Sequence, residues 1–181
     1  KVHGAQKPLS MRLDDQQRVR LYSGSTMSGK TFAEKTLIWQ ILAAQATGFA
    51  PNAGMRLPVF SRLFYFDRIT TQFDRTLSSF GHEVKYWASF LNMVDKEKGL
   101  VLAVADEAGS TTSPRYQEAL SYVLASDLLA AGHFFVMSSH NHRFLDRFTQ
   151  LNGNHTRIYH FKTRLDEKGD VIFDHEIEEG H

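Results

Sequence analysis

The feature that most constrains this chain is a short segment, residues 24–31, in which glycines, a lysine and a threonine stand at fixed spacing. It fully matches the pattern Gly-x-x-x-x-Gly-Lys-[Ser/Thr] and reads Gly24-Ser25-Thr26-Met27-Ser28-Gly29-Lys30-Thr31. Glycines at both ends let backbone N–H groups turn inward around an anion, and a following helix presents the positive end of its dipole. We therefore expect this loop to cradle phosphates, with Lys30 reaching the β and γ phosphates and Thr31 ligating Mg²⁺.

The residues around this segment supply the context that such a loop requires, a strand before it and a helix after it. Residues 19–23 alternate apolar and polar side chains, as a short strand does, and the apolar residues after the loop recur at helical spacing. These apolar residues are Phe32, Leu37, Ile38, Ile41 and Leu42. The order strand, loop, helix favours a phosphate-binding loop over a chance match in a loop of another fold.

Length and composition limit the possible folds. The chain has 181 residues, 42% of them apolar, and no shift in composition, so we expect a single domain over residues 1–181 with a substantial core. Lys and Arg total 21 against 20 acidic residues, and the formal charge of +1 gives no sign of a dedicated nucleic-acid surface. The absence of cysteine excludes disulfides and thiolate metal sites and fits a reducing intracellular setting.

The apolar runs are far shorter than the ~20 residues that a membrane span needs, and the first residues lack the apolar region of a signal peptide. We therefore expect no membrane segment in this chain. Because the sequence does not begin with Met and its last residues stop abruptly, we also expect it to be a fragment of a longer protein.

Beyond the first helix, strand patterns alternate with helix patterns. Three further strands are expected at residues 59–66, 100–105 and 134–137, and two further helices over residues 83–98 and from Ser113-Pro114 onward. The unbroken apolar run at residues 100–105 is typical of a strand buried on both faces of a parallel sheet. A final pair, residues 156–163 and 171–177, flanks a turn-like segment as a β-hairpin. We therefore predict an α/β fold with a mostly parallel central sheet, helices on both faces and a C-terminal β-hairpin.

Two carboxylates follow the apolar run at residues 100–105. Asp106 and Glu107 stand at the carboxyl end of this strand, the edge where open α/β sheets bind their ligands. This is the Walker B arrangement, in which Asp106 would hold Mg²⁺ and Glu107 would orient and polarise the water that attacks the γ phosphate. Taken alone, the pair would merely begin a polar loop. Together with the loop at residues 24–31, it predicts phosphoryl transfer to water.

The strand at residues 134–137 also ends in polar residues, Ser138-Ser139-His140. Many P-loop ATPases place a residue that senses the γ phosphate at this position, and His140 is the candidate; the alternative is a solvated histidine at a strand end. His142 and the pair His82-Glu83 lack the further ligands of a zinc site, so we predict none. No Gly-x-Ser-x-Gly segment occurs, so a serine hydrolase would have no nucleophile.

Together these motifs resemble the C-terminal ATPase domain of MutS-type DNA mismatch-repair proteins, a branch of the ABC-class ATPases. The phosphate-binding loop keeps the family's unusual methionine as Met27, but has Thr26 and Thr31 where the family typically has Asn and Ser. Residues 106–113, an Asp-Glu pair followed by a loop rich in Gly, Ser and Thr, are similar to the family, as is Ser139-His140 at the end of the next strand.

A further segment is similar to the family's Ser-Thr-Phe followed by a Glu, namely Ser78-Ser79-Phe80 with Glu83. In ABC-class ATPases this position holds the signature motif, whose serine reaches the γ phosphate bound by a partner subunit. The resemblance therefore implies Ser78 as a ligand in trans. Alternatively, Ser78-Ser79 caps the helix that follows. The family's Gly-Arg before this serine is replaced by Thr76-Leu77.

The resemblance spans roughly residues 18–180 and implies ATP and Mg²⁺ as cofactors, with ATP hydrolysed to ADP and phosphate. It implies a homodimer, or a dimer with a MutS-like partner, that sandwiches the nucleotide and couples hydrolysis to clamp action on DNA. DNA would be bound by parts of the parent protein that are not in this chain, which would be its C-terminal fragment. The resemblance also implies a cytoplasmic protein, associated with the nucleoid when on DNA, and an isolated domain that is a weak ATPase.

Two other functions fit the same motifs. A P-loop kinase would pass the phosphate to a small molecule and would need an acceptor pocket and an arginine-bearing lid, for which Arg143 and Arg147 are available. Glu107, directly after Asp106, favours water as the acceptor instead. A nucleotide-gated interaction module would bind ATP and dimerise without hydrolysis, and the presence of Glu107 argues against it.

Overall fold

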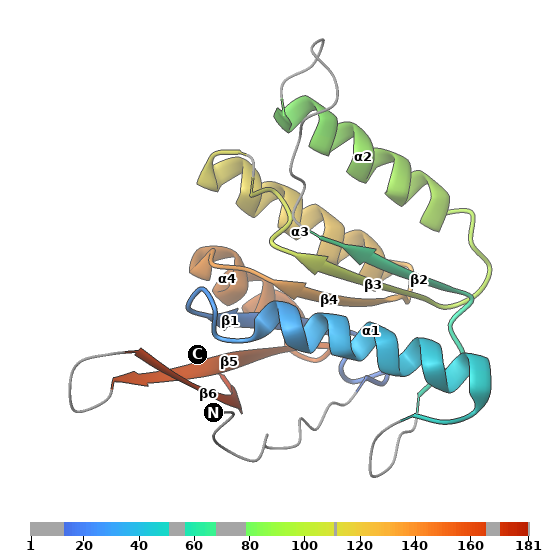
Figure 1. Cartoon of the computed structure of the whole chain (residues 1–181). Coiled ribbons are helices and arrows are strands. Elements are labelled where there is room, and N and C mark those ends of the chain that lie inside the picture. The colour runs from blue at the N-terminus through green and yellow to red at the C-terminus, as the bar shows by residue number, and fades with distance from the viewer. Residues whose placement is uncertain (1–12, 51–56, 68–78, 111, 166–170, 181) are drawn as a thin grey trace.

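The computed structural model describes residues 13–50, 57–67, 79–110, 112–165 and 171–180, which form one six-stranded sheet and four helices (Figure 1). The strands are β1 (Val19–Gly24), β2 (Arg62–Phe66), β3 (Val101–Asp106), β4 (Phe134–Ser138), β5 (Thr156–Leu165) and β6 (Val171–Glu179). The helices are α1 (Lys30–Thr47), α2 (Ser79–Val94), α3 (Pro114–Ala130) and α4 (His142–Asn152). None of these helices is both long enough and apolar enough to cross a membrane, over the residues described.

The sheet is mostly parallel, as the alternation of strand and helix patterns predicted. Its order is β2-β3-β4-β1-β5-β6, and each neighbouring pair is parallel except β5 and β6. These two strands form the predicted antiparallel β-hairpin at one edge of the sheet (Figure 1). Because β1, β3 and β4 are adjacent and parallel, the residues that follow them meet at one edge of the sheet.

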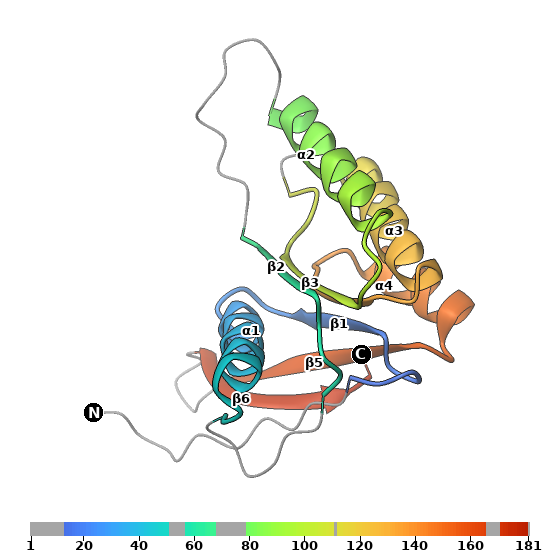
Figure 2. The ribbon, with the colours of Figure 1, turned by 90° about the vertical axis from the view of Figure 1, so that its right-hand side faces the viewer.

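Alternating side chains of the central strands supply two cores, one on each face of the sheet. On β1, Val19 and Leu21 belong to the core that includes residues of α2, α3 and α4, whereas Tyr22 belongs to the core that includes residues of α1. Figure 2 shows α1 on one side of the sheet and the other three helices on the opposite side. Every residue of β1, β3 and β4 is buried, which explains the unbroken apolar run in β3.

The buried face of α1 differs from the one expected from its apolar residues. Leu37 is buried as expected, but Phe32 and Leu42 are 63% and 45% exposed. In their place, Ala33 and Glu34 face the sheet. The pattern of apolar residues misplaced the face because a glutamate is normally assigned to solvent.

The helix α4 is absent from the sequence prediction. It begins after Asn141, whose side-chain oxygen accepts a hydrogen bond from Phe144 N at 3.1 Å and so caps the helix. Its buried side chains are those of Phe144, Leu145 and Phe148. Together with Leu151 they recur at helical spacing along the 11 residues, so a periodic signal was present in the sequence and the prediction missed it.

Candidate functional site

The predicted phosphate-binding loop joins β1 to α1. Three of its residues have positive φ: Gly24 at +132°, Met27 at +67° and Gly29 at +105°. A Cβ at Gly24 would stand 2.9 Å from the carbonyl oxygen of Phe161 on β5. Position 24 therefore requires glycine for both space and backbone conformation, and Gly29 lets the chain turn directly into the helix.

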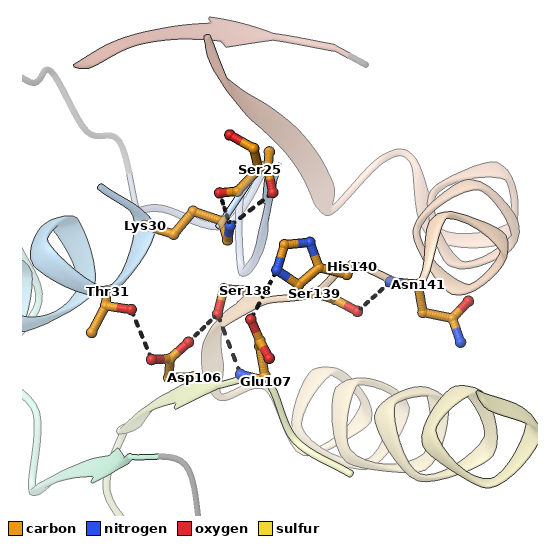
Figure 3. A network of polar contacts seen from close by, with 10 residues as sticks. Ser25, Lys30, Thr31, Asp106, Glu107, Ser138, Ser139, His140 and Asn141 are labelled. Carbon is orange, nitrogen blue, oxygen red and sulfur yellow. Dashed lines mark hydrogen bonds and ion pairs between the residues drawn. The ribbon is translucent and has the colours of Figure 1, made fainter. Parts of the chain in front are cut away.

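Lys30, the first residue of α1, is 5% exposed. Its Nζ donates hydrogen bonds to the carbonyl oxygens of Gly24 at 2.8 Å and Ser25 at 2.7 Å (Figure 3). The ammonium thus lies against the loop at the N-terminal end of α1, where its charge adds to the positive end of the helix dipole. This combination suits a bound anion.

Asp106, the last residue of β3, connects the loop with a neighbouring strand. Its Oδ2 accepts a hydrogen bond from Thr31 Oγ1 at 2.8 Å, and its Oδ1 accepts one from Ser138 Oγ at 2.8 Å (Figure 3). The register of β3 and β4 places Asp106 opposite Ser138. Thr31 and Asp106, the two predicted Mg²⁺ ligands, are therefore in direct contact although 75 positions separate them in the sequence.

Glu107 follows Asp106 but has different neighbours. Its φ of +54° turns the chain out of the strand, and its backbone N–H donates to the carbonyl oxygen and to Oγ of Ser138, each at 3.3 Å. Its Oε1 lies 2.9 Å from His140 Nε2 (Figure 3). The two predicted catalytic residues are thus within hydrogen-bond distance, at the ends of the adjacent strands β3 and β4. The side chain of His140 is 41% exposed and that of Glu107 is 11% exposed, so the pair reaches the surface.

Ser138 does more at this site than the sequence analysis assigned to it. Its buried hydroxyl both donates to Asp106 and accepts from the backbone of Glu107. The available signal was its position directly after a buried strand, at the same sheet edge as the two carboxylates. The position after this strand predicted a γ-phosphate sensor, for which His140 was the candidate, and gave Ser138 no role.

Glu34 on α1 is a buried carboxylate that the sequence analysis did not connect with the site. It is 0% exposed, and neither of its carboxylate oxygens has a hydrogen-bond partner in the described part of the chain. Burial and the charge of Asp106 raise the pKa of Glu34 well above its usual range, opposed by Ser138 and Lys30. The only signal in the sequence is its position one helical turn after Lys30.

Glu83 connects α2 with the loop that follows β3. It is buried, and its Oε1 accepts a hydrogen bond from Gly109 N at 2.7 Å and a longer one from Trp87 Nε1 at 3.5 Å. The helix that follows the predicted signature segment is thereby tied to the loop after the two carboxylates. Ser78, the predicted ligand in trans, lies outside the described residues.

The donor set at the predicted metal position is small. Across the described ranges, no three or more His, Cys, Asp or Glu side chains gather as they would around a metal ion. Thr31 and Asp106 offer one hydroxyl and one carboxylate. This set fits Mg²⁺, which usually keeps several waters and takes one or two carboxylates together with substrate phosphates.

The fold and the site define an α/β protein with a candidate phosphate site at the carboxyl edge of a mostly parallel sheet. Comparison with protein families narrows this class, because the family model described as MutS domain V matches residues 20–181. The chain therefore belongs to the MutS family and corresponds to its C-terminal domain V.

Individual relatives agree with this assignment. The chain is 28% identical over 152 residues to the MutS protein homolog him-14 of Caenorhabditis elegans, covering 83% of this chain and 17% of the relative. It is 27% identical over 177 residues to the DNA mismatch repair protein MutS of Desulfovibrio desulfuricans, covering 96% of this chain and 18% of the relative. It is also 28% identical over 134 residues to the Endonuclease MutS2 of Thermomicrobium roseum, covering 74% of this chain and 16% of the relative. The chain thus spans less than a fifth of the length of each of these relatives.

Proposed function

We propose that this chain binds ATP with Mg²⁺ and hydrolyses it to ADP and phosphate, as a single P-loop ATPase domain of the ABC class within a longer MutS-like protein. The observation that carries the proposal is the contact of 2.8 Å between Thr31 Oγ1 and Asp106 Oδ2. It joins the loop suited to phosphates with the carboxylate suited to a metal ion, so both motifs can act on one nucleotide.

The loop and Lys30 are the groups that would bind the phosphates. Backbone N–H groups of residues 24–31 and the N-terminus of α1 would surround them. Lys30 Nζ would exchange the carbonyl oxygens of Gly24 and Ser25 for charged phosphate oxygens, which are stronger acceptors. Thr31 and Asp106 would hold Mg²⁺, which supplies neutralisation of the charge on the phosphate oxygens.

Glu107 is the residue suited to take the proton of the attacking water. Its backbone is held by Ser138, and its carboxylate lies 2.9 Å from His140 Nε2. A histidine that donates to one carboxylate oxygen orients the group for proton transfer. His140 would therefore position Glu107 in addition to sensing the γ phosphate.

The role of the whole protein is proposed from its relatives. Because the relative from Desulfovibrio desulfuricans is named a DNA mismatch repair protein, we extend the proposal to mismatch repair or a related DNA transaction in the cytoplasm. The nucleotide state of this domain would control dimerisation, and DNA would be held by other parts of the protein. Ser78 would reach the γ phosphate bound by the partner subunit.

Product analysis with ATP and Mg²⁺, without an added acceptor, tests the chemistry. We expect slow formation of ADP and phosphate by the native chain and loss of ATP binding in Lys30→Ala. In Glu107→Gln we expect normal ATP binding and a turnover rate reduced about 10²-fold or more. Phosphate transfer only when a small-molecule acceptor is added would indicate a kinase. Binding without hydrolysis by the native chain would indicate an interaction module, and no binding would refute the proposal.

Sedimentation velocity of the native and Glu107→Gln chains, with and without ATP and Mg²⁺, tests the shared site. We expect an ATP-dependent dimer that persists only in Glu107→Gln, because blocked hydrolysis holds the nucleotide between subunits. A monomer under every condition would count against a sandwich formed by this domain alone.

A further inference from the structure

Glu34 faces the sheet although its side chain ends in a carboxyl group. It is 0% exposed and stands four residues after Lys30 and three after Thr31. Residues at these spacings share a helix face, and helical side chains tilt toward the N-terminus of the helix. The side chain of Glu34 therefore extends toward the turn of α1 that carries the lysine and threonine of the phosphate-binding loop.

The carboxylate of Glu34 is unsatisfied by the protein. Neither Oε1 nor Oε2 has a hydrogen-bond partner among the described residues. A carboxylate removed from water is strongly destabilising unless it is paired or hydrogen-bonded. The neighbouring Lys30 donates to two carbonyl oxygens of the loop. Among the described residues, two buried oxygen acceptors thus remain beside the loop with no donor at hydrogen-bond distance.

The groups that act on this carboxylate belong to the predicted metal site. After burial, the charge of Asp106 does most to raise the pKa of Glu34, and the hydroxyl and backbone of Ser138 and the charge of Lys30 oppose it. Asp106 is in turn hydrogen-bonded to Thr31 and Ser138. Carboxylate and hydroxyl oxygens are the hard ligands that divalent cations select. A purely structural role gives no reason for a second carboxyl group, because an apolar side chain would fill the space without a buried polar group that lacks hydrogen bonds.

We propose that Glu34 is a second carboxylate of the divalent-cation site, acting with Asp106 to make nucleotide binding depend strongly on Mg²⁺. The inference rests on the proposed function, because Thr31 and Asp106 are taken as its metal ligands. Without a cation, Asp106 repels the triphosphate; with Mg²⁺ bound, both carboxylates retain the cation that the phosphates need. Cation and nucleotide then raise each other's affinity by the same factor.

Titration with a fluorescent ATP analogue, in EDTA and in Mg²⁺, measures this factor as the ratio of the two affinities. In Glu34→Gln and Glu34→Met we expect the factor to fall about tenfold, mainly because binding in Mg²⁺ becomes weaker. Glu97→Gln is the matched control, since Glu97 pairs with Arg62 at 2.5 Å near the opposite end of β3 and should leave the factor unchanged. Glu34→Met guards against misfolding, because it removes a buried polar group that lacks hydrogen bonds and should be at least as thermostable as the native chain.

Titration with Mn²⁺ alone, followed by electron paramagnetic resonance, provides a readout without nucleotide. We expect both Glu34 variants to bind Mn²⁺ about tenfold more weakly than the native chain and Glu97→Gln. Folded Glu34 variants whose coupling factor and Mn²⁺ affinity both stay at the native values would overturn the inference. A native chain that binds Mn²⁺ but no ATP analogue would refute the proposed function, while the Mn²⁺ affinities would still decide the role of Glu34. Binding of neither probe would refute both.

Discussion

Replacing Glu83 by alanine would test how the loop after β3 is held in place. The buried carboxylate accepts hydrogen bonds from Gly109 N at 2.7 Å and from Trp87 Nε1 at 3.5 Å. A hydrogen bond to a charged group contributes about 1.5–3 kcal/mol, and a buried donor left without an acceptor costs about 1–3 kcal/mol. We expect Glu83→Ala to lower the free energy of unfolding by about 3 kcal/mol or more. Glu83→Gln keeps an acceptor oxygen and should lower it by about 1–2 kcal/mol.

Urea unfolding followed by far-ultraviolet circular dichroism measures these differences, provided that the slope with urea concentration is unchanged. Glu118→Ala is the control, because the carboxylate of Glu118 lies 3.5 Å from Nε of the mostly exposed Arg143. Such a pair contributes about 0–1 kcal/mol. If Glu83→Ala destabilises the chain no more than Glu118→Ala does, the buried hydrogen bonds of Glu83 are not what holds the loop.

Three further changes test other parts of the structure. Gly24→Ala would place a Cβ 2.9 Å from the Phe161 carbonyl oxygen and should weaken ATP binding about tenfold or more, whereas Gly48→Ala, also at positive φ but with open space around it, should not. Equal binding by these two variants would contradict the argument. Ser138→Ala removes the hydroxyl that orients the aspartate ending β3 and should weaken Mn²⁺ binding about tenfold; native affinity would rule out this orienting role. Burial lowers the pKa of His133 in the folded chain, so the unfolded chain binds a proton at this histidine more readily. The stability that comes from keeping the imidazole neutral is therefore lost as pH falls through the lowered pKa. His133→Gln should flatten the decline in unfolding free energy between about pH 7 and pH 5, and an unchanged decline would refute this.

The loop and the sheet were predictable because their signals are local. Two of the three positions with positive φ in residues 24–31 carry glycine, and the sequence shows them as Gly24 and Gly29. Strands buried on both faces leave unbroken apolar runs, as β3 does in residues 101–105. The parallel order of strands then brought Asp106 to the same edge as the loop, so sequence reasoning could pair two distant motifs.

The rest depended on contacts that a linear pattern does not record. Glu34 is buried because it stands one helical turn after Lys30, on the face of α1 that packs against the sheet. This placement overrides the usual preference of glutamate for solvent. The helix α4 is an exception, since its apolar residues recur at helical spacing and the sequence prediction nevertheless omitted it. The role of Ser138 depends on the register of β3 and β4, and register is not specified by either strand alone.

At Glu107, thermostability and turnover make opposite demands on the sequence. Its φ of +54° is a conformation that glycine adopts freely and that costs other residues about 1–2 kcal/mol. Glu107→Gly would therefore relieve the backbone while removing the carboxylate proposed to activate water. A screen that ranks variants by melting temperature alone would favour that change and would select a more stable protein that lacks the proposed catalytic carboxylate. Engineering of this domain therefore has to measure ATP hydrolysis as well as stability.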